Sequence, residues 1–212
     1  MSRIRLSFAF VLLIIFSFGG LAYSQPHISG AQSGVLGPGT YIVDGSIQVQ
    51  SGQSLTIQPG TEFLHTGSYE WSIMGTLVAE GTETDSIKFL RQQPIDDHRW
   101  GGLRFQPGAN PGSSVSYCVI EYCYHNYIYY FGAGIYNEGV NMSITHCRLS
   151  NCESFADGGA IYCGNVRIEI SDCLIINNQA TNEGNGGGIC LYNCNQALIS
   201  NNIVAFNTCT ST

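Results

Sequence analysis

The sequence predicts an all-β protein built as a solenoid, in which short strands coil into rungs that stack on one another. A nine-residue phrase occurs four times, and its copies begin 29, 26 and 29 residues apart: residues 115–123, 144–152, 170–178 and 199–207. A glycine-rich phrase lies between the copies: residues 132–137, 158–163 and 186–191. Self-similarity at a period of about 20 to 50 residues is typical of stacked-repeat architectures.

The N-terminus has the layout of a secretory signal peptide, predicted for residues 1–24. Arg3 and Arg5 precede an apolar run over residues 6–18, and small residues precede Gln25. The run is shorter than the roughly 20 residues that span a bilayer, which favours a cleaved leader over an anchor. We therefore expect a secreted or cell-surface protein with no membrane span after cleavage, and one domain over residues 25–212.

The charge of the mature chain excludes some classes of partner. The full chain carries a formal net charge of −7, and removal of Arg3 and Arg5 takes it to −9. An acidic surface with so few basic side chains does not suit nucleic acid or anionic membranes. We expect no nucleic-acid partner.

The first half of the mature chain reads as a series of short strands. Strands are expected at residues 40–43, 46–50, 54–58, 61–64, 71–81, 86–90 and 100–105, separated by Gly, Pro and Ser. Ile47 alternates with Val49, so this strand buries one face. The polar residues 91–99 are expected to form a lateral loop rather than a domain boundary. No segment outside the leader shows helical periodicity.

From residue 115 the repeat is regular enough to assign side chains to the inside. A step of three residues between inward positions requires a bend at Ser171 and Asp172. The inward columns are then Val115, Ile144, Ile170 and Ile199; Cys118, Cys147, Cys173 and Asn202; Ile120, Leu149, Ile175 and Val204; and Cys123, Cys152, Asn178 and Asn207. Every inward position is apolar, Cys or Asn, which a shifted register would not give. The asparagines of the last column are predicted to bond the backbone and each other.

Nine cysteines in an exported chain raise the question of disulfides. Stacked cysteines of one column keep their Cβ atoms about 4.8 Å apart, whereas a disulfide needs about 3.8 Å. Cysteines of the inward columns are therefore expected as free thiols, and Cys190, Cys194 and Cys209 are better disulfide candidates. No Cys-x2-Cys pair occurs, so no metal site is predicted.

Several motifs carry a resemblance to a known family. Residues 55–61 (LTIQPGT), 75–82 (GTLVAEGT) and 100–105 (WGGLRF) resemble the opening of secreted bacterial β-helix surface proteins. The GGAI motif at 158–161 and the FN pair at 206–207 are similar to repeats of polymorphic outer-membrane proteins. Residues 40–207 as a whole resemble the pectate-lyase-like superfamily, which implies a single-stranded right-handed parallel β-helix. The chain stops soon after the last copy, which favours a domain truncated at its C-terminal end. This fold hosts lyases, hydrolases, adhesins and passive surface domains, so it implies no activity.

The parts that do not repeat are the candidate binding site. Loops at residues 124–131, 153–157 and 179–185 are expected to emerge on one side of the solenoid. Aromatic faces beside carboxylates suit sugar rings. The candidate glycan-binding residues are Tyr124, Tyr127, Tyr129, Tyr130, Glu153 and Asp157. The expected partner is a polysaccharide, a cell-surface glycan or another surface protein. The alternative interpretation is that these tyrosines pack on one another to order the loop.

No catalytic residue and no cofactor are predicted. The sequence favours a non-catalytic exported scaffold for surface adhesion or glycan binding over a polysaccharide lyase or glycoside hydrolase. The resemblance implies that a lyase would use acidic side chains to hold Ca²⁺ and an Arg or Lys as base. The three loops contain no Arg or Lys, and His125 is their one basic side chain. A hydrolase needs two carboxylates about 5 to 9.5 Å apart, for which Glu153, Asp157 and Glu183 are candidates. Arg148 is predicted to pair with Glu121 on the surface.

Overall fold

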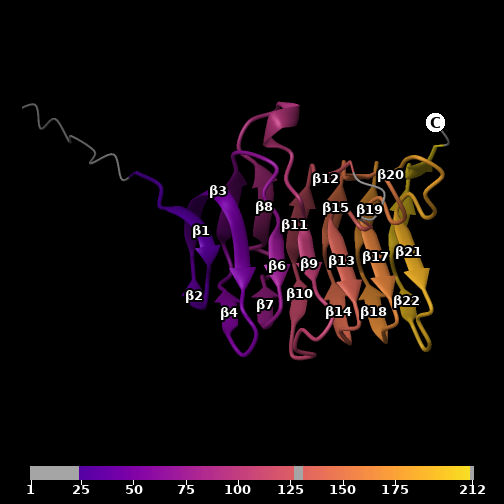
Figure 1. Cartoon of the computed structure of the whole chain (residues 1–212), viewed down its shortest axis with the longest axis horizontal. Coiled ribbons are helices and arrows are strands. Elements are labelled where there is room, and N and C mark those ends of the chain that lie inside the picture. The colour runs from indigo at the N-terminus through magenta and orange to yellow at the C-terminus, as the bar shows by residue number, and fades with distance from the viewer. Residues whose placement is uncertain (1–23, 127–130, 211–212) are drawn as a thin grey trace, which may run out of the picture.

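The computed structural model describes residues 24–126 and 131–210, and these form a right-handed parallel β-helix of about six turns. The rungs succeed one another along the long axis of the molecule, from the N-terminal β1 to the C-terminal β22 (Figure 1). The predicted fold class is confirmed. The signal peptide predicted for residues 1–24 lies outside the described residues except for Ser24. No helix of the described part of the chain is long and apolar enough to cross a membrane.

Three walls and one narrow sheet enclose the core. The first wall is a seven-stranded sheet of β2 (Gly34–Leu36), β4 (Ser54–Ile57), β7 (Thr76–Glu80), β10 (Ser114–Ser116), β14 (Met142–Thr145), β18 (Ile168–Ser171) and β22 (Leu198–Ser200). The second wall contains β5 (Thr61–His65), β8 (Ile87–Arg91), β11 (Cys118–Glu121), β15 (Arg148–Ser150), β19 (Leu174–Ile176) and β23 (Ile203–Ala205). The third wall contains β6 (Trp71–Ile73), β9 (Leu103–Phe105), β13 (Ile135–Glu138), β17 (Ile161–Gly164) and β21 (Ile189–Tyr192).

The long strand β3 (Gly39–Val49) joins the second and third walls, because its first half pairs with β5 and its second half with β6. It also pairs with β1 (His27–Ala31). The narrow sheet consists of β12 (Tyr124–His125), β16 (Glu153–Ser154), β20 (Gln179–Ala180) and β24 (Thr208–Cys209). The predicted lateral loop protrudes between β8 and β9 and contains one turn of 3-10 helix, η1 (Asp96–His98) (Figure 1).

The register confirms the predicted inward columns in the first three copies, whereas Ile199 and Val204 of the last copy are paired in register but exposed. Ile144 pairs with Val115 on one side and with Ile170 on the other. Leu149 is likewise paired with Ile120 and Ile175. All six side chains are buried. Identical apolar positions therefore stack into one continuous core along the axis.

The bend predicted at Asp172 is present and recurs in each regular rung. Asp172 has φ 56° and follows the end of β18. Tyr117, His146 and Asn201 occupy the same place in their rungs, with φ 47°, 53° and 54°. A left-handed residue at this place turns the chain from the first wall into the second.

The asparagine column forms the predicted ladder. Asn178 Nδ2 donates to Asn207 Oδ1 (2.9 Å) and to the carbonyl of Leu149 (3.1 Å). Its Oδ1 accepts the backbone N–H of Cys152 at 3.0 Å. Asn178 is 1% exposed, so its amide satisfies backbone groups that water does not reach.

All nine cysteines are free thiols. The inward thiols donate to carbonyls of the preceding rung, as Cys147 Sγ does to Val115 O at 3.6 Å. Cys190, Cys194 and Cys209, the better candidates for disulfides, are free as well. Burial raises the pKa of the Cys147 and Cys163 thiols well above the ordinary value, so these groups stay protonated.

The recurring glycine phrase has a steric cause. Gly158 adopts φ 75°, which L side chains rarely adopt. A Cβ on Gly159 would lie 2.0 Å from the carbonyl oxygen of Gly187 in the next rung. Glycine at this place lets the backbones of neighbouring rungs approach each other.

Candidate functional site

The candidate site lies at the narrow sheet, where the predicted loops leave the rungs. Tyr124 pairs with Glu153, Glu153 with Gln179, and Gln179 with Thr208. The structure thus brings the predicted residues Tyr124 and Glu153 side by side on successive rungs. Tyr127, Tyr129 and Tyr130 lie outside the described residues.

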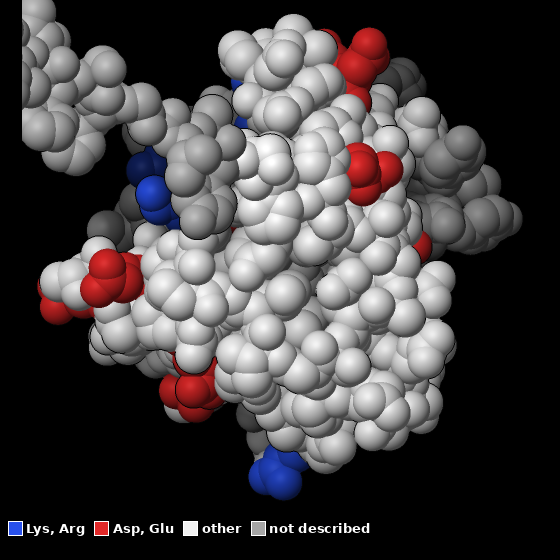
Figure 2. All heavy atoms as spheres, turned by 90° about the vertical axis from the view of Figure 1, so that its left-hand side faces the viewer, with Lys and Arg blue, Asp and Glu red and all other residues white. Residues whose placement is uncertain are grey.

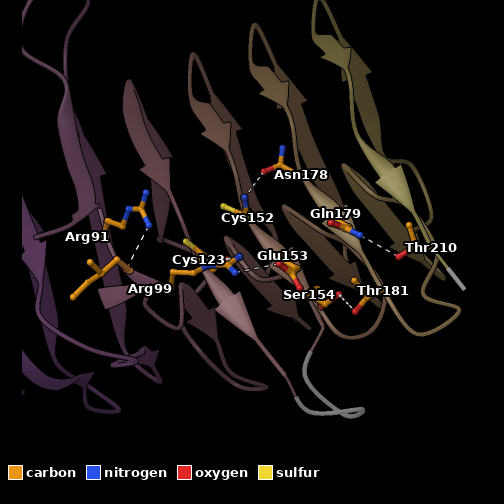
Figure 3. Close-up of polar contacts among 11 residues, drawn as sticks. Arg91, Arg99, Cys123, Cys152, Glu153, Ser154, Asn178, Gln179, Thr181 and Thr210 are labelled. Carbon is orange, nitrogen blue, oxygen red and sulfur yellow. Dashed lines mark hydrogen bonds and ion pairs between the residues drawn. The ribbon is translucent and has the colours of Figure 1, made fainter. Parts of the chain in front are cut away.

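Arg99 reaches this sheet from the lateral loop. Its Nη1 lies 3.1 Å from Glu153 Oε2, and Nη2 donates to the carbonyl of Cys123 at 3.4 Å (Figure 3). The guanidinium carbon lies 4.3 Å from the ring centroid of Tyr124. The Arg99 side chain is 15% exposed, so its contacts with Tyr124 and Glu153 are largely shielded from water and hold both side chains in place. The next residue, Trp100, bridges to Cys123, which fixes the return of the lateral loop.

Polar side chains continue along the narrow sheet beyond Glu153. Gln179 Nε2 donates to Thr210 Oγ1 at 3.1 Å, and Thr181 Oγ1 donates to the carbonyl of Ser154 at 3.3 Å (Figure 3). We call Glu153, Gln179 and Thr210 the polar stripe.

Asp157 has a partner within the protein. Its Oδ1 accepts the backbone N–H of Asn185 at 2.6 Å and the Asn185 side-chain amide at 3.0 Å. This carboxylate ties the loop after β16 to the loop of the next rung. Glu153 and Asp157 thus each have a partner within the protein.

The end of the aromatic loop packs on the third wall. Phe131 stacks on Tyr162 with ring centroids 4.8 Å apart, and Tyr162 stacks on Tyr136 at 5.8 Å. Arg104 lies over the other side of this row, 4.5 Å from the Tyr136 centroid. Phe131 thus packs on the third wall, while Tyr127, Tyr129 and Tyr130, for which packing on one another was the alternative, lie outside the described residues.

A cavity of about 280 Å³ opens beside Tyr124. It is lined by Ser46, Ser68, Glu70, Gly101, Tyr124, His125 and Asn126. The lining combines one aromatic ring with hydroxyls, a carboxylate and an amide. Figure 2 views the molecule from its N-terminal end and shows isolated charged side chains on a mainly uncharged surface. Glu70 supplies the carboxylate of this cavity.

Buried charged and polar groups support the cavity from behind. Arg104 is 4% exposed, and its Nε lies 3.6 Å from Glu70 Oε2. Its Nη1 donates to the carbonyl of Phe131 at 3.3 Å and lies 3.0 Å from His125 Nε2. The same His125 nitrogen lies 2.6 Å from Gly101 O. Burial, and next the charge of Arg104, lower the pKa of His125 to about 3, so its imidazole is neutral at physiological pH.

Sequence reasoning did not include Arg99, Arg104 or Glu70 in the site. Arg104 could have been found, because it lies between the inward residues Leu103 and Phe105 and so must point outward. Arg148 and Glu121 form the predicted ion pair, at 3.0 Å. The described residues hold no group of three or more His, Cys, Asp or Glu side chains that could bind a metal ion.

Comparison of the chain with protein-family models, curated proteins and solved structures finds no match.

Proposed function

We propose that this protein is an exported, non-catalytic β-helix scaffold that binds a polysaccharide or cell-surface glycan at the Tyr124 cavity. The observation that carries the proposal is the composition of this cavity. It sets the Tyr124 ring beside the Glu70 carboxylate, serine hydroxyls and the Asn126 amide. A sugar offers an apolar C–H face and a rim of hydroxyls, and these two kinds of surface are what such a lining complements.

The cavity is ordered before a ligand arrives. Arg99 covers the Tyr124 ring and is itself held by Glu153. Arg104 holds Glu70 from the buried side. Side chains that are already fixed in the free protein lose less conformational entropy on binding. A neutral sugar, which makes few strong contacts, can therefore still be bound.

The polar stripe supports an extended ligand rather than a single sugar. Glu153, Gln179 and the strand before Thr210 lie on successive rungs. Rungs are about 4.8 Å apart, so hydrogen-bonding groups recur at this interval along the axis. A glycan chain lying parallel to the axis could contact the cavity and the stripe together.

We propose as well that the chain is related to pectate-lyase-like β-helix proteins, and in particular to secreted bacterial surface proteins. The parallel β-helix supports this relationship. The engaged carboxylates of Glu153 and Asp157 favour a binding role over a lyase or hydrolase role.

Glycan binding by the mature domain, residues 25–212, tests the proposal on a glycan array followed by calorimetry. Tyr124→Ala and Asn126→Ala should weaken binding of the selected glycan about tenfold, which corresponds to about 1.4 kcal/mol. The control Tyr192→Ala changes an exposed tyrosine at the C-terminal end of the third wall and should bind like the parent. Circular dichroism checks that each variant is folded. Absence of any glycan ligand for the parent, or equal binding by all three variants, would overturn the proposal.

A further inference from the structure

A second hollow, of about 470 Å³, lies at the corner between the first and second walls. Its lining comes from successive rungs and includes Thr82, Glu83, Ser86, Tyr117, His146 and Asp172. Strand β11 separates this corner from the narrow sheet, so the hollow is distinct from the Tyr124 cavity. We call it the corner groove.

The corner groove places a tyrosine where the backbone favours a smaller residue. Tyr117 has φ 47°, and the same corner position holds His146, Asp172 and Asn201 in later rungs. Asp and Asn tolerate the left-handed region, whereas it is unfavourable for a bulky aromatic residue. Tyr122, the other left-handed tyrosine, lies under the guanidinium of Arg91 at 3.7 Å. Every regular rung has a left-handed residue at this bend, and in this rung it is a tyrosine that lines the groove.

The two aromatic side chains of the groove form one platform. The Tyr117 and His146 rings are stacked with centroids 4.4 Å apart and an interplanar angle of 17°. They come from adjacent rungs, because β10 pairs with β14. Such a platform offers an extended aromatic surface beside the hollow.

The charges of the groove favour a cation. The carboxylates of Glu83 and Asp172 make no ion pair within the described part of the chain. The basic side chain at the groove, Arg148, is already paired with Glu121. The two free carboxylates therefore dominate the local field.

We propose that the corner groove binds an oligosaccharide of amino sugars that carry free ammonium groups. Sugar rings stack on Tyr117 and His146, and ammonium groups pair with Glu83 and Asp172. Glu83 lies one rung before Tyr117, and Asp172 lies two rungs after it. Three rungs measure about 14 Å, so an oligomer is needed to reach both carboxylates. This inference does not rest on the Tyr124 cavity.

The probe is a tetramer of glucosamine, titrated by calorimetry into the mature domain at low salt. The parent should bind it, with an affinity that falls as salt is added. The N-acetylated tetramer, which lacks the charge, and spermidine, which lacks the rings, should each bind at least tenfold more weakly. Equal binding of the acetylated tetramer or of spermidine would overturn the proposal, as would no binding of the glucosamine tetramer.

Tyr117→Asn separates recognition from folding. Asparagine suits the left-handed backbone, so the variant should melt at the same or a higher temperature than the parent, yet bind the tetramer at least tenfold more weakly. Asp172→Asn keeps a residue suited to the bend and should likewise lose affinity. Tyr124→Ala should keep it, which distinguishes this groove from the first cavity. Unchanged affinity in Tyr117→Asn and Asp172→Asn would place the binding elsewhere.

Discussion

Asn178 is the side chain through which the asparagine ladder can be tested most directly. Replacement by Ala removes three hydrogen bonds: from Cys152 N (3.0 Å), to Leu149 O (3.1 Å) and to Asn207 Oδ1 (2.9 Å). Cys152 N and Leu149 O are backbone groups inside the solenoid, and no water replaces the lost amide in a space this closely packed. The variant therefore loses bonds and leaves buried groups unpaired.

The expected loss follows from these contacts. Each hydrogen bond contributes about 1 kcal/mol, and a buried donor left unpaired costs about 1 to 3 kcal/mol more. Asn178→Ala should therefore lower the free energy of unfolding by about 4 kcal/mol. For a domain of about 150–250 residues, each kcal/mol shifts the midpoint by about 2–4 °C, which gives about 12 °C here. Asn178→Cys, which introduces the residue found at Cys152 in the same column, should cost about half as much.

The assay is denaturant unfolding followed by circular dichroism and by tryptophan fluorescence. Trp71 and Trp100 are buried in N-terminal rungs, so their fluorescence misses an early loss of the C-terminal rungs, whereas circular dichroism detects it. The control Asn195→Ala changes an exposed asparagine and should stay within about 0.5 kcal/mol of the parent. A loss below about 1 kcal/mol for Asn178→Ala by circular dichroism would refute the ladder as a source of stability.

Three further expectations concern close approach, thiol burial and pH. Gly159→Ala should destabilise the fold by more than 3 kcal/mol, because the new Cβ would clash with the backbone of the next rung. The control Gly139→Ala has open space around its Cβ and should cost only about 1 kcal/mol. Equal losses of the two variants in thermal unfolding would contradict the steric account. A maleimide should label the exposed Cys209 first and the six buried thiols only in denaturant. Mass spectrometry of the timed reaction measures this order, and early labelling of a buried thiol would contradict the burial of the inward cysteines. Burial lowers the pKa of His65 to about 3, so the folded protein keeps it neutral while the unfolded chain takes up a proton below about pH 6.5. Stability from this group is complete above pH 6.5 and is lost as the pH falls towards 3, by about 3 kcal/mol at pH 4.5. His65→Gln should flatten this dependence in unfolding titrations, and a dependence equal to that of the parent would contradict this account.

Most of the fold could be predicted because the rung repeats in both spacing and chemistry. Inward positions at Ile144 and Leu149 follow from alternation within each short strand and from the bend between them. Once four copies share these positions, the parallel stacking of rungs is the arrangement that buries all of them. The left-handed conformation of Tyr117 could not be predicted from its residue type, because tyrosine rarely adopts it, and the available signal was the column that it shares with His146, Asp172 and Asn201.

The candidate site was predictable only where it follows the repeat. Tyr124 and Glu153 are neighbours because both occupy the first position of the narrow sheet. Arg99 meets Glu153 across 54 residues of sequence, from a loop that has no counterpart in the other rungs. Glu70 lies before β6 in the N-terminal rungs, where the spacing is irregular, and the alternation within β9 turns Arg104 outward without showing that it meets Glu70. To predict contacts made by inserted loops, the three-dimensional path of the loop must be known, and the repeat period does not give this path.

Packing and binding are compatible roles for the aromatic loop. Phe131 fixes one end of the loop to the third wall through Tyr162, and Arg99 fixes the other end through Tyr124. Arg104 links the two ends, since it contacts the carbonyl of Phe131 and lies beside the cavity that Tyr124 lines. Both ends are thus held by the solenoid before any ligand is present. The anchored ends lose little conformational freedom on binding, so the packing of Phe131 favours recognition at Tyr124 rather than competing with it.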